Sequence, residues 1–380
     1  MSHDLIYLAP HPWDTIAQRP QHLARALAQH HRILVVGPVA PSIAGTLGHL
    51  IKRERQTQWR GSIVQRAHNL WTYTLPRGLP LTMDSLTANR LGHALVTGRV
   101  RAHLASLRFT KPKIVVGWPL SYPFARALGS RVVIYDCMDN FPAFPMSAQR
   151  RRIIVANERA LVRRANALVT TSRSLAALWS TRGYQAQIIP NGVTPSFFES
   201  VAPAQEIAAL PGPRLVYIGL LGPWLDTALL LTLARRHPDW SIIMIGPTEI
   251  DLKPLRAAPN IHLLGPRSHE SLPYYLAAAD ACLIPFIISP LTRAVNPVKL
   301  YEYLAAGVPV ISTPLPEVAA FAEVCAIAET ADQFTLAVED AVRESPTDQR
   351  RQQRRALAAV NTWSTRAAAY TDLLDTLAGA

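Results

Sequence analysis

Residues 281–313 read ACLIPFIISPLTRAVNPVKLYEYLAAGVPVIST, and this stretch indicates the fold. It begins and ends with short apolar runs, Ala281–Ile284 and Pro309–Ser312, that are typical of buried strands. Between them, Pro297–Ala306 has the pattern of a helix with a proline at its first position and Asn296 as its expected N-cap. Two apolar strands joined by a helix form a βαβ unit, which makes the two strands parallel in one sheet.

The same alternation of short apolar runs and helical patterns extends along the whole chain. The expected strands are Leu5–Ala9, Ile33–Val36, Ile114–Gly117, Val132–Asp136, Ala167–Thr171, Gln187–Ile189, Leu215–Ile218, Ile242–Ile245, Ile261–Leu264 and Cys325–Ala328, besides the two above. The expected helices include Gln18–His30, Asp84–Leu107, Ser147–Arg164, Ser174–Arg182, Thr227–Arg236, Glu270–Ala278, Ala331–Arg343, Thr347–Val360 and Arg366–Leu377. Residues 191–213, rich in proline and glycine, are the expected linker. The pattern therefore predicts an α/β protein of two doubly wound, Rossmann-like domains, residues 1–190 and 214–363.

Composition and charge narrow the class of protein. The chain has 380 residues, 49% of them hydrophobic and 17% charged, which excludes a disordered protein. Residues 1–195 hold 25 Lys and Arg against seven Asp and Glu, a net charge of +18, whereas residues 196–380 have a net charge of −5. A basic half attracts an anionic partner, although arginine-rich solvated helices alone also explain the excess.

Three cysteines, Cys137, Cys282 and Cys325, are too few and too far apart for a disulfide framework or a four-cysteine zinc site. The N-terminus lacks the pattern of a signal peptide, and the longest uncharged stretch, 33–51, is interrupted by glycine and prolines. We therefore expect a cytoplasmic protein, soluble or peripheral at the inner face of the cell membrane. Glycine-rich dinucleotide and P-loop motifs are missing, as are the Gly-x-Ser-x-Gly and His-Glu-x-x-His motifs, which disfavours dehydrogenases, P-loop ATPases, hydrolases and zinc proteases.

The helix at Pro297–Ala306 carries the clearest candidate site. Its N-terminus follows a parallel strand, where free backbone N–H groups favour an anion, and Lys299 lies in its first turn. Glu302 lies about one turn further on and could accept hydrogen bonds from the two hydroxyls of a ribose. A nucleoside diphosphate offers both groups, although an ordinary surface Lys–Glu pair has the same spacing.

The segment NPVKLYEYLAAGVPVIST strongly resembles the donor-site motif of GT-B glycosyltransferases of the group 1, GT4-like superfamily, and of its teichuronic-acid-type branch of polysaccharide biosynthesis. Further stretches resemble that branch in order and spacing, so that the resemblance covers nearly the whole chain: WDTIAQRPQH (13–22), VIYDCMDN (133–140), IPNGV (189–193), LVYIGLLGPWLD (215–226), LLGPR (263–267) and residues 279–286. The resemblance implies two Rossmann-like domains facing each other across a cleft. It implies an N-terminal acceptor domain with the last helix, 364–380, returning to it, and a C-terminal donor domain.

The resemblance also implies a donor site. Glu302 matches the second glutamate of the family's Glu-x7-Glu motif, which binds the ribose, but Ala294 stands at the first. The family's Arg and Lys after the first donor-domain strand are absent, so Lys299, with Arg293, is the expected partner of the diphosphate. The remaining expected donor-site residues are Asn296 and Val298 of the same motif, Gly219 and Gly222, where the backbone approaches the donor, and Arg267 near the base.

Acidic residues are scarce in the first domain, and only Asp136 and Asp139 follow a central strand. Asp139 matches the position of the general base in a distantly related bacterial glucuronosyltransferase, and Asp136 could orient it or cap a loop. His11 and Trp13 lie in the loop after the first strand, where we expect contact with acceptor or phosphate, and Arg19 is expected to face phosphate.

The sequence thus predicts a metal-independent hexosyl- or glycosyltransferase with no cofactor that uses a nucleoside-diphosphate sugar, with UDP as the expected nucleotide. Its expected acceptor is a glycan or a lipid-diphosphate-linked glycan of the bacterial cell surface, and no nucleic acid is expected. A GT-B-fold nucleotide-sugar epimerase and a basic nucleic-acid-binding protein are the alternatives. Kinship favours retention of configuration whereas an aspartate base and Ala294 favour inversion, so both outcomes stand.

Overall fold

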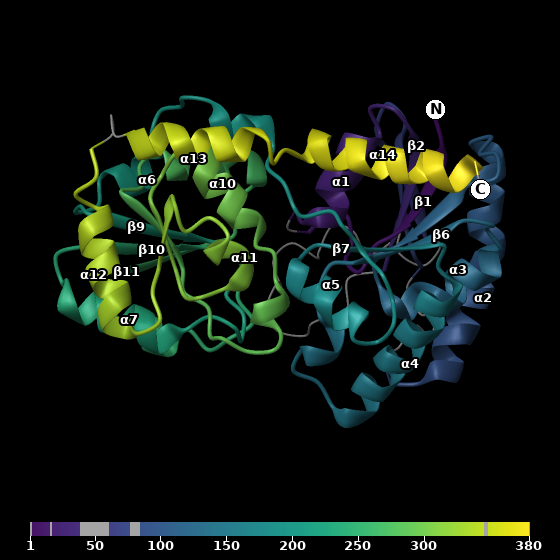
Figure 1. The fold of residues 1–380 in the computed structure, drawn as a ribbon, viewed down its shortest axis with the longest axis horizontal. Coiled ribbons are helices and arrows are strands. Elements are labelled where there is room, and N and C mark those ends of the chain that lie inside the picture. Colours follow the sequence, from purple (N-terminus) through teal and green to yellow (C-terminus); the bar gives the residue numbers. More distant parts are fainter. Residues whose placement is uncertain (1, 16, 39–60, 77–83, 346–348, 380) are drawn as a thin grey trace. The chain divides into compact units, whose positions relative to one another are not determined.

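The structure is a computed structural model that describes residues 2–15, 17–38, 61–76, 84–345 and 349–379. The chain divides into two compact units (Figure 1). Unit 1 consists of Met1–Thr171, Leu175–Ile189 and Ala367–Ala380, and unit 2 consists of Ser172–Ser174 and Pro190–Arg366.

The centre of unit 1 is an eight-stranded sheet with the order β3-β4-β2-β1-β5-β6-β7-β8. All neighbouring strands are parallel except β3 and β4, which form an antiparallel pair. The strands are β1 (Asp4–Leu8), β2 (Arg32–Gly37), β3 (Ser62–Ala67), β4 (Leu70–Thr74), β5 (Lys113–Val116), β6 (Val133–Cys137), β7 (Ala167–Thr170) and β8 (Gln187–Ile188). The central strands are almost fully buried, which explains their continuous apolar runs.

Helices cover both faces of this sheet. Figure 1 shows α1 (Arg19–Leu27) and α14 (Trp363–Gly379) against one face and α2 (Leu86–Ser106), α3 (Tyr122–Leu128) and α4 (Ala148–Arg164) against the other. Helix α5 (Arg173–Ser180) connects β7 to β8. The C-terminal part of α14 is anchored in unit 1, because Lys113 Nζ donates a hydrogen bond to the Leu374 carbonyl oxygen at 3.1 Å.

Unit 2 contains a six-stranded parallel sheet with the order β11-β10-β9-β12-β13-β14. Its strands are β9 (Arg214–Ile218), β10 (Ser241–Ile245), β11 (Ile261–Gly265), β12 (Ala281–Ile284), β13 (Val310–Ser312) and β14 (Cys325–Ile327). Its helices are α6 (Gln205–Ala208), α7 (Thr227–Arg236), α8 (Lys253–Arg256), α9 (Leu272–Leu276), α10 (Val298–Ala306), α11 (Pro316–Ala319), α12 (Ala331–Ala341) and α13 (Gln349–Ala359). The chain leaves β9 toward β10 and later returns to its other side at β12, so the topological switch point lies at the carboxyl end of β9.

The structure confirms the α/β class and the parallel sheets. The β3–β4 pair and the helices α3, α6, α8 and α11 were not expected from the sequence. The stretch 191–213, expected to be a linker, is folded into unit 2, where Phe197 of the short helix η4 (Pro195–Phe198) is 1% exposed and Val193 pairs with Thr362. Of the helices in the described residues, none has the length and hydropathy needed to cross a bilayer.

Candidate nucleotide-binding site in unit 2

Glycines shape the carboxyl edge of the unit 2 sheet. Gly219 follows β9 with φ +135°, and Gly246 follows β10 with φ +148°. The Gly219 amide donates to the Ile245 carbonyl at 2.8 Å, and the Gly246 amide donates to the Gly265 carbonyl at 2.9 Å. A Cβ atom on Gly246 would overlap the carbonyl oxygen of Gly219, so the two backbones can approach only because this position is glycine. Sequence analysis named Gly219 and missed Gly246.

Lys299 lies directly above this edge. Its Nζ donates to the Tyr217 hydroxyl at 3.0 Å, and it lies 4.1 Å from the centre of the Tyr217 ring and 4.7 Å from the centre of the Phe286 ring. A Cβ atom on Gly219 would be 2.7 Å from the same nitrogen. The lysine from α10 therefore occupies the end of β9, and two aromatic faces hold it there.

The surroundings of Lys299 shift the protonation equilibrium of its ammonium group. Burial lowers the pKa of Lys299 to about 7, and the nearby Glu302 carboxylate acts in the opposite direction. A bound anion would favour the charged form in the same way. The ammonium group is thus poised to gain a proton when an anion binds.

Glu302 is almost completely buried on the second turn of α10, where its side chain is 6% exposed. Its Oε1 atom is 2.8 Å from Nε2 of His269, which begins the short helix η5 (His269–Ser271) after β11. The His269 ring lies against the Phe197 ring, with 5.1 Å between their centres. Sequence analysis did not single out His269; the only signal was a histidine just beyond the carboxyl end of the third strand of unit 2.

Asn296 has a different role from the one expected. The N-cap residue of α10 is Pro297, so the helix starts one residue later than predicted, and no side chain caps it. The Asn296 side chain instead accepts from the Asn191 amide at 2.9 Å and donates to the Tyr301 hydroxyl at 2.9 Å and to Glu317 at 3.3 Å. These contacts use both its oxygen and its nitrogen, so Asn296 holds the loop in place from within unit 2, and the expected donor contact of this residue stays a prediction.

Arg267 is also engaged within unit 2. Its guanidinium pairs with Glu206 at 3.0 Å and donates to the Tyr275 hydroxyl at 2.7 Å and the Leu264 carbonyl at 2.6 Å. The arginine therefore ties the loop after β11 to α6 and α9, and its expected place near the nucleobase stays a prediction.

The remaining expected donor residues lie at the same end of unit 2. Val298 is half-buried in the first turn of α10, and Arg293 is exposed in the short helix η6 (Thr292–Ala294) before it. A Cβ atom on Gly222 would be 2.7 Å from the Trp224 ring, so the loop after β9 is also packed closely. Ala294, at the position of the family's first glutamate, is 5% exposed, and its carbonyl accepts from the Ser172 hydroxyl at 2.7 Å.

In unit 1, Asp136 and Arg19 form a buried ion pair. The Arg19 side chain donates from Nε and Nη2 to both oxygens of Asp136 over 2.9–3.1 Å, and the Tyr7 hydroxyl donates to the same carboxylate at 2.6 Å. The Arg19 and Asp136 side chains are 2% and 0% exposed. Arg19 is therefore engaged with Asp136 within unit 1, and the expected roles of Arg19 toward phosphate and of Asp136 in catalysis stay predictions.

Asp139 lies just beyond β6 and differs from its neighbour. Among the described residues no hydrogen bond or ion pair to its carboxylate is found, and burial raises its pKa to about 7 while Arg19 acts to lower it. Asp139 therefore has the protonation behaviour that a general base near neutral pH requires.

The other expected residues of unit 1 lie in the loop after β1. His11 is exposed there, and Trp13 is half-buried with the Arg25 guanidinium over its ring at 5.4 Å.

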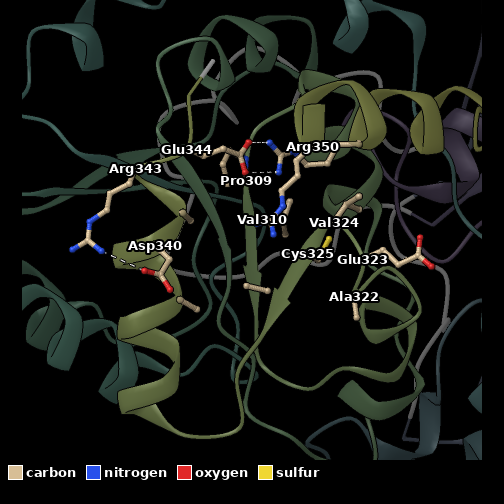
Figure 2. Close-up of a pocket in the computed structure, with 14 residues that line it drawn as sticks. Pro309, Val310, Ala322, Glu323, Val324, Cys325, Asp340, Arg343, Glu344 and Arg350 are labelled. Carbon is tan, nitrogen blue, oxygen red and sulfur yellow. Dashed lines mark hydrogen bonds and ion pairs between the residues drawn. The ribbon is translucent and has the colours of Figure 1, made fainter. Parts of the chain in front are cut away.

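A hollow of about 400 Å³ lies elsewhere in unit 2 (Figure 2). It opens at the amino ends of β13 and β14, beside Val310 and Cys325, and thus at the edge opposite Lys299. Figure 2 shows that part of its charged rim is internally paired, since Arg343 contacts Asp340 at 3.3 Å. In the described part of the chain, no group of three His, Cys, Asp or Glu side chains is arranged to hold a metal ion.

Comparison with known proteins shows what the fold and the sequence of unit 2 resemble. Residues 212–344 match the family model "Glycosyl transferases group 1". Residues 212–344, which make up most of unit 2, are thus similar to the group 1 glycosyl transferases. This segment holds Gly219, Lys299 and Glu302, so the resemblance seen in the sequence is confirmed for the part of the chain that carries the candidate site.

The relatives extend the likeness to the rest of the chain. A putative teichuronic acid biosynthesis glycosyltransferase, TuaH of Bacillus subtilis (strain 168), is 30% identical over 202 residues, which is 48% of this chain and 51% of that protein. The match thus spans about half the length of this curated relative. The crystal structure of WaaG, a glycosyltransferase involved in lipopolysaccharide biosynthesis, has a TM-score of 0.65 at 14% identity and covers 97% of this chain and 99% of its own. Anabaena HepE in complex with UDP and glucose has a TM-score of 0.65 at 14% identity, covering 98% and 99%. These structures confirm the GT-B fold over nearly the whole chain.

Proposed function

We propose that the chain is a metal-independent glycosyltransferase that moves a sugar from a nucleoside-diphosphate sugar to a glycan or lipid-linked glycan of the bacterial cell surface. One observation carries this proposal: Lys299 is held by Tyr217 and Phe286 above Gly219, at the switch point of the unit 2 sheet. A cation over a glycine edge at a helix N-terminus is the chemistry that a diphosphate requires.

Each candidate residue has a place in the transfer reaction. Lys299 and the free N–H groups of α10 neutralise the diphosphate as its bond to the anomeric carbon breaks. Glu302 accepts hydrogen bonds from the ribose hydroxyls. Asp139 takes the proton from the acceptor hydroxyl as its oxygen bonds to the anomeric carbon, which its raised pKa favours. UDP is the proposed nucleotide, and the HepE structure with UDP supports this choice by analogy of fold.

Nucleotide binding tests the donor site. We expect calorimetry with UDP, GDP, ADP and dTDP to show micromolar binding of one diphosphate to the wild type and a strong loss in Lys299→Ala. Lys253→Ala is the matched control, because Lys253 is an exposed lysine at the start of α8 in the same unit. Wild-type protein that is folded but binds none of the four would overturn the proposal, and turnover of the donor without any acceptor would indicate an epimerase instead.

We further propose that unit 1 lies against an anionic membrane surface where a lipid-linked acceptor is held. Helix α4 supports this role, because Arg152, Arg159 and Arg163 are exposed on it. Its single acidic residue, Glu158, is 3% exposed and accepts a hydrogen bond from the Tyr135 hydroxyl at 2.7 Å. Each such cation contributes about 1 kcal/mol near an anionic bilayer.

Vesicle binding tests the membrane proposal separately from catalysis. The protein should sediment with anionic vesicles and not with neutral ones, binding should weaken as salt rises, and the triple variant R152Q/R159Q/R163Q should bind less. Equal binding to both kinds of vesicle would refute the membrane contact and leave the transferase proposal standing.

A further inference from the structure

The contact between His269 and Glu302 joins two elements that the chain brings together from 33 residues apart. His269 lies in the loop after β11, and Glu302 lies on α10, which follows β12. Their side chains are 14% and 6% exposed. Both groups are therefore largely removed from water, where a hydrogen bond between them has a large effect on the geometry of each.

The imidazole is fixed from more than one side. The Phe197 ring packs against it with 5.1 Å between ring centres, and Phe197 is itself 1% exposed in the core of unit 2. An ionised carboxylate only accepts hydrogen bonds, so the contact requires that Nε2 of His269 carries the hydrogen. The ring thus presents a donor of fixed position to Oε1 of Glu302.

A buried carboxylate with one oxygen bound is oriented, whereas one with neither oxygen bound rotates or attracts water. His269 occupies Oε1, and among the described residues no hydrogen bond to the second oxygen of Glu302 is found, so that this oxygen can accept from a ligand. Lys299, one turn earlier on α10, fixes the diphosphate end of the same ligand. Helix α10 and the His269 contact together then set the distance between the Lys299 ammonium group and the Glu302 carboxylate that accepts from the ribose hydroxyls.

We propose that His269 is a positioning residue that orients the Glu302 carboxylate toward the 2′- and 3′-hydroxyls of the nucleotide, and so sets the preference for ribose over deoxyribose. This role rests on the proposed nucleotide site. It goes beyond that site by assigning sugar discrimination to a residue that contacts Glu302 and need not contact the nucleotide.

The experiment compares ribo- and deoxyribonucleotides with one base. After the tightest of UDP, GDP and ADP is found by calorimetry, the wild type is titrated with that nucleotide and with its 2′-deoxy analogue. We expect the wild type to prefer the ribonucleotide by about tenfold or more, the effect of one hydrogen bond to a charged group. His269→Phe keeps a ring against Phe197 but has no donor, and His269→Asn has a donor too short to reach Glu302. In both variants the preference should fall to about onefold, because only ribonucleotide binding weakens. His269→Gln, whose amide nitrogen can replace Nε2, should retain most of it.

Each result has one meaning. A preference that survives in His269→Phe and His269→Asn, or an equal loss for both nucleotides, would overturn the positioning role and indicate a purely structural contact. A wild type that binds the diphosphate without preferring ribose would overturn the role and leave the nucleotide site in place. A folded wild type that binds no nucleotide would overturn the proposed function itself. Melting temperatures of all variants show whether each one is folded.

Discussion

The lowered pKa of Lys299 makes a quantitative prediction about nucleotide binding. If only the ammonium form binds the diphosphate, the observed dissociation constant rises once the pH exceeds about 7. The Glu302 carboxylate acts on the lysine charge from nearby, and burial keeps the Tyr217 hydroxyl, 3.0 Å from Nζ, protonated by raising its pKa. The pH dependence should therefore arise mainly from the lysine.

The size of the effect follows from a single ionisation at a pKa of about 7. Relative to the fully protonated lysine, binding should weaken about 1.3-fold at pH 6.5, about tenfold at pH 8 and about a hundredfold at pH 9. Protonation of the terminal phosphate, with a pKa of about 6, sets the lower limit of a clean measurement. Binding should take up about half a proton at pH 7 and nearly a whole proton at pH 8.5.

Calorimetry in buffers of different ionisation enthalpy measures both the affinity and the proton uptake. Lys299→Met should bind weakly with little pH dependence over this range, and Lys299→Arg should also lose the dependence because arginine stays charged. Lys253→Met, the control, should behave as the wild type. Wild-type binding that is constant from pH 6.5 to about 9 with no proton uptake would refute the reasoning.

The ligand-free protein offers an independent check. Between pH 7 and about 10 the unfolded chain, with an ordinary lysine, binds more protons at this position than the folded chain. The contribution of Lys299 to stability is therefore unfavourable below pH 7 and disappears as the pH rises through this window. Lys299→Met should remove this dependence and raise the melting temperature at pH 7, at the expense of binding.

Three further predictions concern the sheet edges. Gly246→Ala should lower the free energy of unfolding by roughly 2 kcal/mol or more in chemical denaturation, because its φ is strained for alanine and the added Cβ would overlap a carbonyl oxygen. The control Gly98→Ala, on an exposed helix surface, should be neutral or stabilising. Equal effects of the two substitutions would contradict the close approach of the Gly219 and Gly246 backbones. Asp139→Asn should reduce transfer by about 10²–10⁴-fold and leave nucleotide binding unchanged, and full activity in this variant would exclude it as the base. Asp136→Asn should lower stability by about 3–5 kcal/mol because Arg19 stays buried without its counter-charge, and an unchanged melting curve would argue against that account.

The sequence predicted the central strands because each is buried on both faces and must be apolar throughout. It did not predict the β3–β4 pair, since β3 lies at the edge of the sheet with four of its six residues exposed and carries no apolar run. Helix α3 was missed because Pro119 and Pro123 interrupt its pattern, although proline is tolerated in a first turn. The periodicity of apolar residues along the sequence indicates which face of a regular helix or strand is buried. It gives little information about strands at the edge of a sheet or about short helices.

The residues of the candidate site were likewise predictable from the sequence only in part. Lys299 and Glu302 could be predicted because their spacing on one helix and a family motif coincide. His269 and Gly246 could not, because their importance depends on contacts with residues far away in the sequence. The expected N-cap at Asn296 was wrong for the same reason, since its side-chain oxygen accepts from the Asn191 amide, far away in the sequence.

The two aspartates at the end of β6 show how environment separates residues that the sequence presents as equivalent. Asp136 receives three donors from Arg19 and Tyr7 and is completely buried, so its carboxylate is occupied by contacts within unit 1. Asp139 lies three residues away, where burial raises its pKa to about 7 and its carboxylate lacks such donors among the described residues. A group that binds and releases a proton near neutral pH must lose little when its charge changes. Asp139 satisfies that condition, whereas the Asp136 carboxylate is already occupied by Arg19 and Tyr7, which is why we assign the proposed base to Asp139.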